Sequence, residues 1–329
     1  MGVSLAAAAV VAAAALTPAL VSGSAAPIQP PDCSQQDATI VANPGGEVVK
    51  GTAGDDVIIG SSEADVIEAG GGNDTVCADD GDDQILGQAG DDILVGDTGD
   101  DAVLGSDGDD ELFGGTGVDE LLGGEGDDYA NGEEGSDSLL GGAGKDHLVA
   151  FHGKDFVIGE GSADQLNGSS GADFLVAGAG DDRASGELGP DFVDGASSFD
   201  VVFGGKKADL VFGGTDEDEM TTGPGADLMY GGGGDDLMHG LGGDDELFAG
   251  GRLDTLFGDA GNDLLMGGTE SDELSGGSGD DLLFGELAAD ALNGDAGKDR
   301  CDGGSNVPGR TSTKTKDTAK GCETTKDVP

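Results

Sequence analysis

The feature that most constrains this sequence is a nine-residue repeat that begins at Gly51 and ends at Asp302. It contains 28 consecutive nonapeptides without one insertion or deletion, and we number them as coils 1 to 28 from Gly51. The sixth position of every coil is Asp, and the eighth position is always apolar. An unbroken short period of this kind predicts a solenoid of stacked coils, not a domain built around one large core.

Each nonapeptide divides into a turn and a short strand. The first six positions are rich in Gly and Asp, which favour turns because Gly accepts positive φ and Asp tolerates it. In the last three positions the middle side chain points inward and its two neighbours point outward. One coil cannot bury its single inward side chain alone, so the coils must stack into a thin ladder of Ile, Val, Leu and Met. The pattern therefore predicts an all-β chain.

Charge is the second constraint. The chain has a net charge of −54, and residues 51–302 hold 62 of its 68 acidic residues but only 8 of its 14 Lys and Arg. Repulsion on this scale would normally keep a glycine-rich chain disordered. A nucleic-acid partner bound through a basic face is excluded. Carboxylate oxygens at fixed spacing are the ligands that Ca²⁺ prefers, which indicates that calcium neutralises the repeat.

The consensus of the coils is G-G-x-G-x-D-x-U-x, where U is apolar, as in GGAGKDHLV (141–149) and GGSGDDLLF (276–284). This nonapeptide resembles the RTX, or haemolysin-type, calcium-binding repeat, and the resemblance covers about three quarters of the chain. The C-terminal pattern RCDGG…CE…VP, which contains Cys301 and Cys322, and the N-terminal pattern C…ATIV, which starts at Cys33, also resemble small secreted calcium-binding RTX proteins of high-GC Gram-positive bacteria. The family implies a parallel β-roll with two nonapeptides per turn, here about 14 turns and roughly 65–70 Å long, with capped ends.

The resemblance also implies where the metal binds. In this family each ion lies between the loops of adjacent turns on the same edge, held by motif aspartates that are two coils apart and by loop carbonyls. We expect folding to be coupled to multiple Ca²⁺ ions, with roughly the 10⁻⁴ to 10⁻³ M affinity of extracellular modules. The predicted ligands are Asp56, Asp74, Asp83, Asp92, Asp101, Asp110, Asp119, Asp128, Asp137, Asp146, Asp155, Asp173, Asp182, Asp191, Asp227, Asp236, Asp245, Asp263, Asp281 and Asp299.

The fourth position separates odd coils from even coils. It is Gly in 20 of the 28 coils, but from coil 13 onward six of eight odd coils lose this Gly, whereas seven of eight even coils keep it. Alternate coils lie on opposite edges of a roll with two coils per turn. We therefore predict that one edge of the C-terminal half binds a row of ions and that the other is largely metal-free. The replacements are Ser162, Ser198, Asp216, Arg252, Glu270 and Ala288 in odd coils, and Lys207 in an even coil.

The outward ninth position shows the same alternation, because the even coils carry an apolar series there that only Asp194 interrupts. One face of the rod is thus predicted to present a long apolar stripe, which indicates self-association or a surface partner. The alternative is that strand propensity alone favours such residues. The series is Leu86, Leu104, Leu122, Leu140, Ile158, Val176, Phe212, Tyr230, Phe248, Met266 and Phe284.

The two ends of the chain differ from the repeat. Residues 1–26 resemble a secretory signal peptide, although they lack a basic residue at the start; the alternative, a membrane anchor, is disfavoured by Pro18 and the Ala-rich composition. We assign residues 27–50 to an N-terminal cap, 51–302 to the roll and 303–329 to a C-terminal cap or tail, because a solenoid needs closed ends. The mature protein is predicted to be secreted and to have no membrane span.

An exported chain with four cysteines is expected to form disulfides. Cys77 and Cys301 are nearly 25 coils apart, which is roughly 60 Å along the rod and far beyond the Cα separation of about 7 Å that a disulfide allows. The same distance makes any end-to-end pair improbable. We predict the pairs Cys33–Cys77 and Cys301–Cys322.

The sequence nominates no catalytic residues. None of its three histidines lies in an H-E-x-x-H motif, and it contains neither a G-x-S-x-G elbow nor a P-loop. Carboxylate pairs occur in so many coils that they cannot single out an acid–base pair. We therefore predict a non-enzymatic, secreted calcium-binding protein with a structural or adhesive role at the cell exterior. The alternative is an extracellular enzyme that acts on a glycan or peptide polymer and uses the roll as its scaffold.

Overall fold

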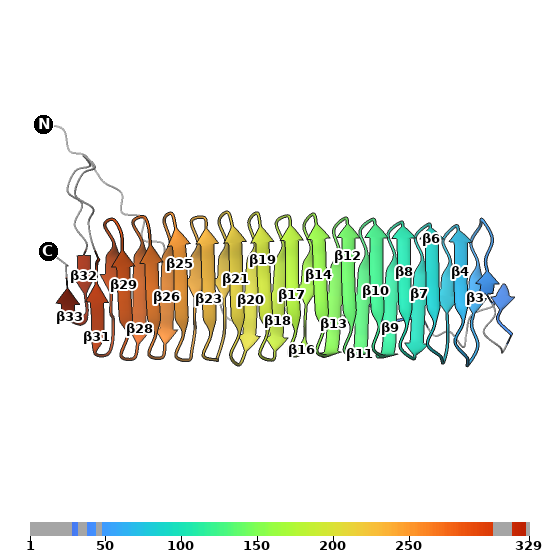
Figure 1. Ribbon diagram of the computed structural model, residues 1–329, viewed down its shortest axis with the longest axis horizontal. Coiled ribbons are helices and arrows are strands. Elements are labelled where there is room, and N and C mark those ends of the chain that lie inside the picture. The colour runs from blue at the N-terminus through green and yellow to red at the C-terminus, as the bar shows by residue number, and fades with distance from the viewer. Residues whose placement is uncertain (1–27, 32–37, 44–47, 305–317, 327–329) are drawn as a thin grey trace, which may run out of the picture. The chain divides into compact units, whose positions relative to one another are not determined.

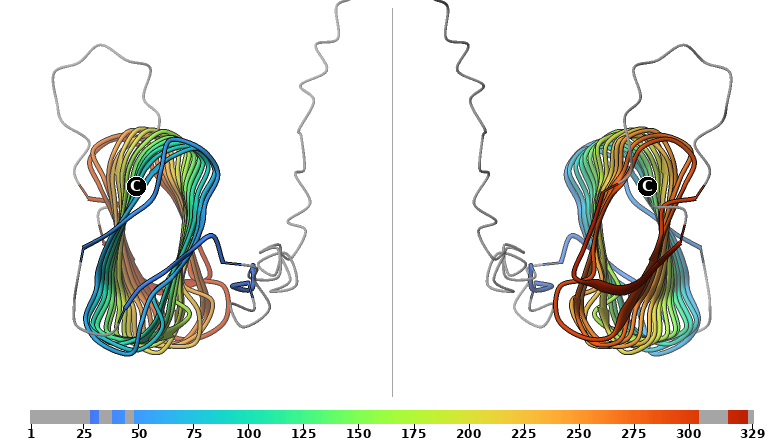
Figure 2. Two further views of the ribbon diagram at one scale, coloured as in Figure 1. Left: turned by 90° about the vertical axis from the view of Figure 1, so that its right-hand side faces the viewer. Right: turned by 90° about the vertical axis from the view of Figure 1, so that its left-hand side faces the viewer.

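The computed structural model describes residues 28–31, 38–43, 48–304 and 318–326. Its strands wind into a solenoid in which the coils follow one another in chain order along a single axis (Figure 1). Viewed end-on, the coils superimpose as an oval with strands along its two long sides and loops at its two ends (Figure 2). No helix occurs in these residues, and neighbouring strands pair in parallel. The predicted all-β parallel roll is confirmed.

Odd coils build a 17-stranded sheet, which we call the odd sheet, and even coils build a 16-stranded sheet, the even sheet. The odd sheet comprises β1 (Ile40–Val41), β3 (Val57–Ile59), β5 (Thr75–Cys77), β7 (Ile93–Thr98), β9 (Glu111–Gly117), β11 (Tyr129–Gly135), β13 (His147–Gly153), β15 (Gln165–Asn167), β16 (Ser170–Gly171), β18 (Arg183–Leu188), β20 (Val201–Lys206), β22 (Glu219–Thr221), β24 (Leu237–His239), β26 (Thr255–Ala260), β28 (Glu273–Ser278), β30 (Ala291–Asn293) and β32 (Thr318–Lys320). The even sheet comprises β2 (Val48–Lys50), β4 (Val66–Gly71), β6 (Gln84–Ala89), β8 (Ala102–Asp107), β10 (Glu120–Glu125), β12 (Ser138–Ala143), β14 (Phe156–Gly161), β17 (Phe174–Ala179), β19 (Phe192–Ser197), β21 (Leu210–Thr215), β23 (Leu228–Gly233), β25 (Glu246–Gly251), β27 (Leu264–Gly268), β29 (Leu282–Glu286), β31 (Asp299–Asp302) and β33 (Cys322–Lys326).

The register between neighbouring strands is constant along the repeat, because each residue pairs with its equivalent two nonapeptides away. Leu121 pairs with Leu139 on one side and with Val103 on the other. Each turn therefore contains one odd and one even coil, and the repeat makes about 14 turns. The constant register keeps equivalent positions of successive turns directly above one another.

The core is a single ladder of eighth-position side chains between the two sheets. Leu121, Leu139 and Leu148 are fully buried, and the same holds for nearly all equivalents from Ile58 to Cys301. Each coil contributes one inward eighth-position side chain, as the period predicts, and five coils add a buried alanine at the first position. Such a core buries little apolar surface to offset the repulsion within a chain of net charge −54.

A second apolar cluster lies on the outer face of the odd sheet. Phe113 is fully buried there and Tyr129 is 5 % exposed, with Val95 and Val149 beside them. The Phe113 and Tyr129 rings are 5.8 Å apart between centroids. This outer face is thus buried over part of its length.

Both sheets extend beyond the 28 coils. Upstream, β1 pairs with β3 and β2 with β4 in the same register as the strands of the repeat. Downstream, β32 pairs with β30 and β33 pairs with β31. A disulfide joins Cys301 to Cys322, whose Cα atoms are 5.9 Å apart, and so ties β31 to β33.

Other expectations for the ends fall partly outside the described residues. Cys77 is disulfide-bonded, but its predicted partner Cys33 is not among the residues described. The same is true of the predicted signal peptide, 1–26, and of residues 305–317 in the C-terminal tail. In the part of the chain that the structure covers, no helix has the length and apolarity needed to cross a membrane.

Candidate metal centre

The sixth-position aspartate of each coil lies at the end of the loop, directly before the strand, and its side chain reaches back toward the first residue of its own coil. A Cβ atom on Gly114 would lie 2.5 Å from Asp119 Oδ2 and 2.9 Å from the carbonyl oxygen of Gly132. Glycine at the first position therefore leaves the space that a carboxylate oxygen and a carbonyl oxygen occupy together. The local sequence brings two oxygen donors to the inside of each loop.

Backbone hydrogen bonds join the aspartates into one row along each edge of the roll. The N–H of Asp101 donates to Asp119 Oδ1 at 2.9 Å, and the N–H of Asp119 donates to Asp137 Oδ1 at 3.0 Å. The same bond, between 2.7 and 3.1 Å long, links every motif aspartate from Asp56 to Asp281 to its equivalent in the next turn. From Asp74 onward the row fixes each carboxylate and satisfies its Oδ1, whereas Oδ1 of Asp65 has no partner.

The other carboxylate oxygen, Oδ2, is left without a hydrogen-bond partner. Within the described roll this holds for every motif aspartate from Asp74 to Asp281 except Asp227. These residues are at most 3 % exposed, so bulk solvent does not reach the oxygen. A buried, unpaired carboxylate oxygen is strongly unfavourable unless a positive group reaches it. The rows therefore present a series of buried anionic oxygens that need cations.

Burial raises the pKa of these carboxyl groups. For Asp119, burial is the largest cause and the carboxylates of Asp137 and Asp101 add to it, so the pKa reaches about 7 although the N–H of Asp101 lowers it. Burial and neighbouring carboxylates likewise raise the pKa of Asp200 to about 8. A bound cation would reverse this effect, because it favours the ionised form.

The second position of the coil decides whether Oδ2 is left unpaired. Its backbone has positive φ in every coil from coil 3 to coil 28 except coil 20, as at Gly115 before Asp119, where φ is 108°. It does not have positive φ at Thr52, Ser61 or Gly223. In those three coils the second-position N–H donates to Oδ2 of the coil's own aspartate, at 2.7, 2.8 and 3.5 Å. The left-handed turn thus points this N–H away from the carboxylate.

In coil 1 the aspartate is fully paired by the protein itself. Asp56 Oδ2 accepts hydrogen bonds from the Thr52 hydroxyl at 2.8 Å and from the Thr52 N–H. Thr39 Oγ1 lies 3.1 Å from Asp56 Oδ1. Hydrogen bonds from Thr52, and to a lesser degree from Thr39, lower the pKa of Asp56 against the opposing effect of burial. Asp56, predicted as a ligand, therefore lies in a different environment from the interior aspartates.

Calcium fits the interior rows. It takes six to eight oxygen ligands from carboxylates, carbonyls and water in a flexible geometry, whereas Mg²⁺ demands a near-ideal octahedron and keeps several waters. No group of three or more Asp, Glu, His or Cys side chains converges in the described residues. Motif carboxylates would therefore hold each ion together with loop carbonyls and water.

The same rows contain eight aspartates that are not among the predicted ligands. All eight are buried, and all except Asp65 accept the backbone bond of the row. Their coils lack Gly at the fourth position, but the invariance of Asp at the sixth position was a sufficient signal to include them. They are Asp65, Asp164, Asp200, Asp209, Asp218, Asp254, Asp272 and Asp290.

The two edges differ in backbone more than in carboxylates. At the fourth position of odd coils, Ser162 and Asp216 keep positive φ, at 97° and 78°. Fourth-position glycines with positive φ have larger values on both edges, as at Gly180 of an odd coil (150°) and Gly243 of an even coil (144°). A side chain at positive φ is strained, so the stacked loops hold the same turn without glycine. Unequal metal loading of the two edges stays a prediction.

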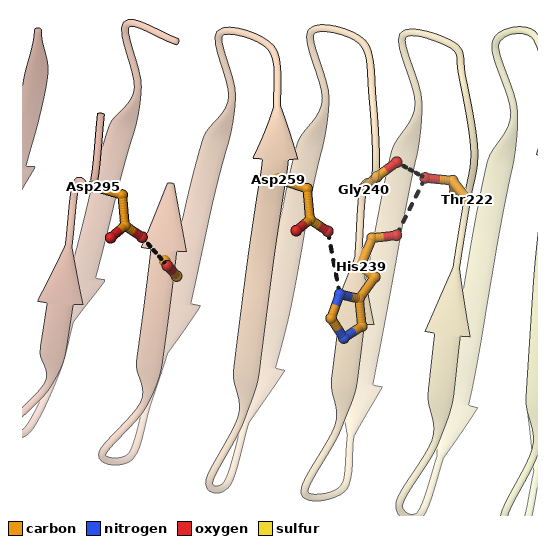
Figure 3. A network of polar contacts seen from close by, with 6 residues as sticks. Thr222, His239, Gly240, Asp259 and Asp295 are labelled. Carbon is orange, nitrogen blue, oxygen red and sulfur yellow. Dashed lines mark hydrogen bonds and ion pairs between the residues drawn. The ribbon is translucent and has the colours of Figure 1, made fainter. Parts of the chain in front are cut away.

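A separate set of polar contacts lies on the outer face of the odd sheet (Figure 3). His239 Nδ1 is 3.2 Å from Asp259 Oδ2, and the His239 ring stacks on Phe257 at 4.5 Å between centroids. The Ser275 hydroxyl lies 2.5 Å from Asp295 Oδ2. The serine is thus engaged with a carboxylate and not with the histidine, so these contacts do not form the nucleophile–base pair that covalent catalysis needs.

Comparison with known proteins agrees with this geometry. The family described as RTX calcium-binding nonapeptide repeat (4 copies) has a model that matches successive stretches of the chain between residues 41 and 306. The chain belongs to the RTX calcium-binding repeat family. The matched stretches are 41–76, 50–85, 78–103, 86–121, 104–139, 113–148, 131–166, 158–193, 194–229, 221–251, 239–274 and 275–306. No curated protein matches the sequence.

Membership in the RTX family indicates which ion the repeats bind. The repeats are calcium-binding, and the β-roll that they build is a structural fold. The unpaired Oδ2 atoms are the groups of this RTX chain whose surroundings call most directly for calcium.

Proposed function

We propose that this protein is a secreted structural or adhesive rod that folds when it meets calcium outside the cell. The observation that carries the proposal is the pair of aspartate rows, in which buried carboxylate oxygens have no hydrogen-bond partner across the described interior coils. The chain has a net charge of −54 and one core side chain per nonapeptide to oppose that repulsion. Bound calcium would supply the stability that this core alone does not.

Each ion would act on two levels. It would neutralise the carboxylate of one loop, and it would link that loop to the next turn, because the aspartates of adjacent turns already share a backbone hydrogen bond. A site built from two turns exists only when both turns are folded, so the free energy of binding becomes free energy of folding. Neighbouring sites share loops, which makes folding along the rod cooperative. The chain would remain unfolded where calcium is scarce.

Export and maturation belong to the same proposal. Residues 1–26 would be removed as a signal peptide, which leaves a cap at 27–50, the roll at 51–302 and a tail at 303–329. The bonds Cys33–Cys77 and Cys301–Cys322 would fasten the two ends, where a solenoid is most exposed to fraying. The oxidised state of Cys77 and the bond between β31 and β33 support this assignment, because structural disulfides persist in oxidising compartments.

A calcium titration tests the proposal. Far-ultraviolet circular dichroism of the purified protein should change from a disordered to a β-rich spectrum as calcium reaches the millimolar range. Calorimetry should report several ions bound per chain over the same range. Magnesium at equal concentration is the control, and it should not produce the β-rich spectrum. A protein that is equally compact in excess chelator and in calcium contradicts the proposal.

A further inference from the structure

The outer face of the even sheet carries a continuous ladder of aromatic rings, which we call the aromatic face. Its centroid distances lie between 4.3 and 5.4 Å from one turn to the next. Phe156 and Phe174 are 40 % and 37 % exposed, so the ladder is open to solvent. The ladder consists of Phe156, Phe174, Phe192, Phe212, Tyr230 and Phe248.

The aromatic face lacks the dense negative charge of the loops. In the coils that carry the ladder, Asp194 and Glu246 are the only charged residues at the outward seventh and ninth positions. The other outward residues there are Leu, Ile or Val. On a chain of net charge −54, another acidic body can approach this strip more closely than it can approach the acidic loops. Large apolar patches of this kind mark interaction sites.

The arrangement of the rings restricts what can bind. Phe174 and Phe192 are nearly parallel, with 5° between their planes, and Tyr230 and Phe248 are 15° apart. Rings stacked along the rod cover one another's faces and turn their edges outward. A sugar stacks on an open ring face, so the ladder is poorly suited to a glycan. It instead forms ridges that repeat at the strand spacing of about 4.8 Å.

We infer that the aromatic face binds a second copy of this chain, so that two rolls pack with their even sheets face to face. Ridges with this spacing interlock best with a surface of the same pitch, and a second copy supplies that pitch automatically. Two sheets pack in this way about 10 Å apart in β-sandwiches. The contact would also place weakly charged surfaces of two highly acidic chains against each other, while the acidic loops stay in solvent.

The size of the strip agrees with a dimer. The apolar ninth positions run from Leu86 to Phe284 over 12 even coils, which is about 58 Å at the strand spacing. With the outward seventh positions, which include Gln84, Glu120 and Ser138 beyond the ladder, the contact would be about 12 Å wide, so each copy would bury about 700 Å² and the pair about 1,400 Å². Specific interfaces bury about 1,200–2,000 Å² in total. The contact is therefore large enough for a specific dimer.

This inference depends on the proposed function, because the aromatic face exists only in the folded roll. The experiment therefore records circular dichroism and molar mass on the same samples of the full chain in calcium, with the mass taken from sedimentation equilibrium at micromolar protein. We expect a β-rich spectrum and twice the chain mass. A disordered spectrum in calcium refutes the proposed function; a β-rich spectrum with the mass of one chain refutes the dimer alone.

Two matched variants locate the contact. Phe212→Asp places a charge at the ninth position of an even coil, and Phe257→Asp does the same in an odd coil. Phe212→Asp should weaken the dimer at least about tenfold, whereas Phe257→Asp should leave the mass doubled. Phe174→Ser is the milder variant if Phe212→Asp does not give a β-rich spectrum. Equal effects of Phe212→Asp and Phe257→Asp would overturn the assignment of the face.

A third measurement tests whether the aromatic face binds a lipid surface instead of a second copy. Vesicles of a zwitterionic phospholipid should not sediment the folded wild-type protein if the aromatic face is occupied by a second copy. Monomeric protein that sediments with the vesicles would overturn the dimer in favour of a lipid surface.

Discussion

Coil 1 and the interior coils contain the same aspartate at the same place, yet the two regions satisfy it differently. Asp56 receives the hydroxyl and N–H of Thr52, and its pKa is lowered. Asp119 receives one backbone N–H on Oδ1 and none on Oδ2, and its pKa is raised to about 7. The aspartate motif alone therefore does not determine whether a coil depends on calcium. The local donors around each carboxylate do.

The physical origin of the difference is a backbone angle. Positive φ at the second position, as at Gly115, turns the N–H away from the carboxylate, and the oxygen is left for a cation. At Thr52 and Ser61 the backbone is not left-handed, and each residue adds a side-chain hydroxyl to its N–H as a donor. The aspartates of the first two coils therefore have protein donors on Oδ2, although Oδ1 of Asp65 stays buried without a partner.

Calcium removal should have the largest effect on the interior coils. Excess chelator should unfold the interior coils, because their carboxylates lose the only cation able to reach Oδ2. Hydrogen exchange followed by mass spectrometry should show that peptides covering β9 to β12 lose their protection by orders of magnitude. Restored calcium should return it. Protection in those peptides that does not change with chelator would contradict the account of the interior rows.

Single substitutions should separate the two regions. Asp119→Asn removes the charge of an interior carboxylate, so it should lower the number of ions bound and cost about 3 kcal/mol in calcium, as the loss of a buried charge partner does. Asp56→Asn is the matched control in coil 1. It should leave the number of bound ions unchanged in calorimetry. A reduced calcium count in Asp56→Asn would show that coil 1 also holds an ion.

Acidification should act on the interior rows in the absence of calcium. The pKa of Asp119 is about 7 in the roll against an ordinary value of 3.8, so the folded state binds more protons than the unfolded chain between these values. The contribution of such groups to stability is complete below about pH 4 and is lost as the pH rises through about 7. In chelator, the β-rich signal in circular dichroism should therefore increase from about pH 8 to pH 5. A decrease over that range would contradict the raised pKa values.

The smallest effect is expected in coil 2. Ser61→Ala removes the hydroxyl that lies 2.9 Å from Asp65 Oδ2 while the N–H bond remains. The loss should be about 1 kcal/mol, measured as a lower melting temperature in calcium with an unchanged number of bound ions. Ser106→Ala is the control, because Ser106 occupies the same position of its coil but has φ of 95°. If the two variants lose equal stability, the Ser61 hydrogen bond does not contribute.

The period and its phase could be read from the sequence because stacking requires them. An apolar eighth position and an invariant sixth-position Asp place Leu121 in the ladder and Asp119 in an edge row before any coordinate is known. A fourth-position Gly is a poor guide to which aspartates belong to the rows, because the turn forms without it. Ser162 and Asp216 keep the left-handed turn that Gly would supply, and their aspartates stay in the rows.

The sequence by itself determined the architecture, since identical units that bury one side chain each can be stable only when stacked in constant register. The tertiary structure decided which groups each side chain meets in the neighbouring turns. Thr39 beside Asp56, the turn that removes the Gly115 N–H from Asp119, and the stacking of the aromatic face all depend on the relative orientation of successive turns. Such orientation follows from backbone angles and cross-turn contacts, which a one-dimensional pattern of residue types does not specify.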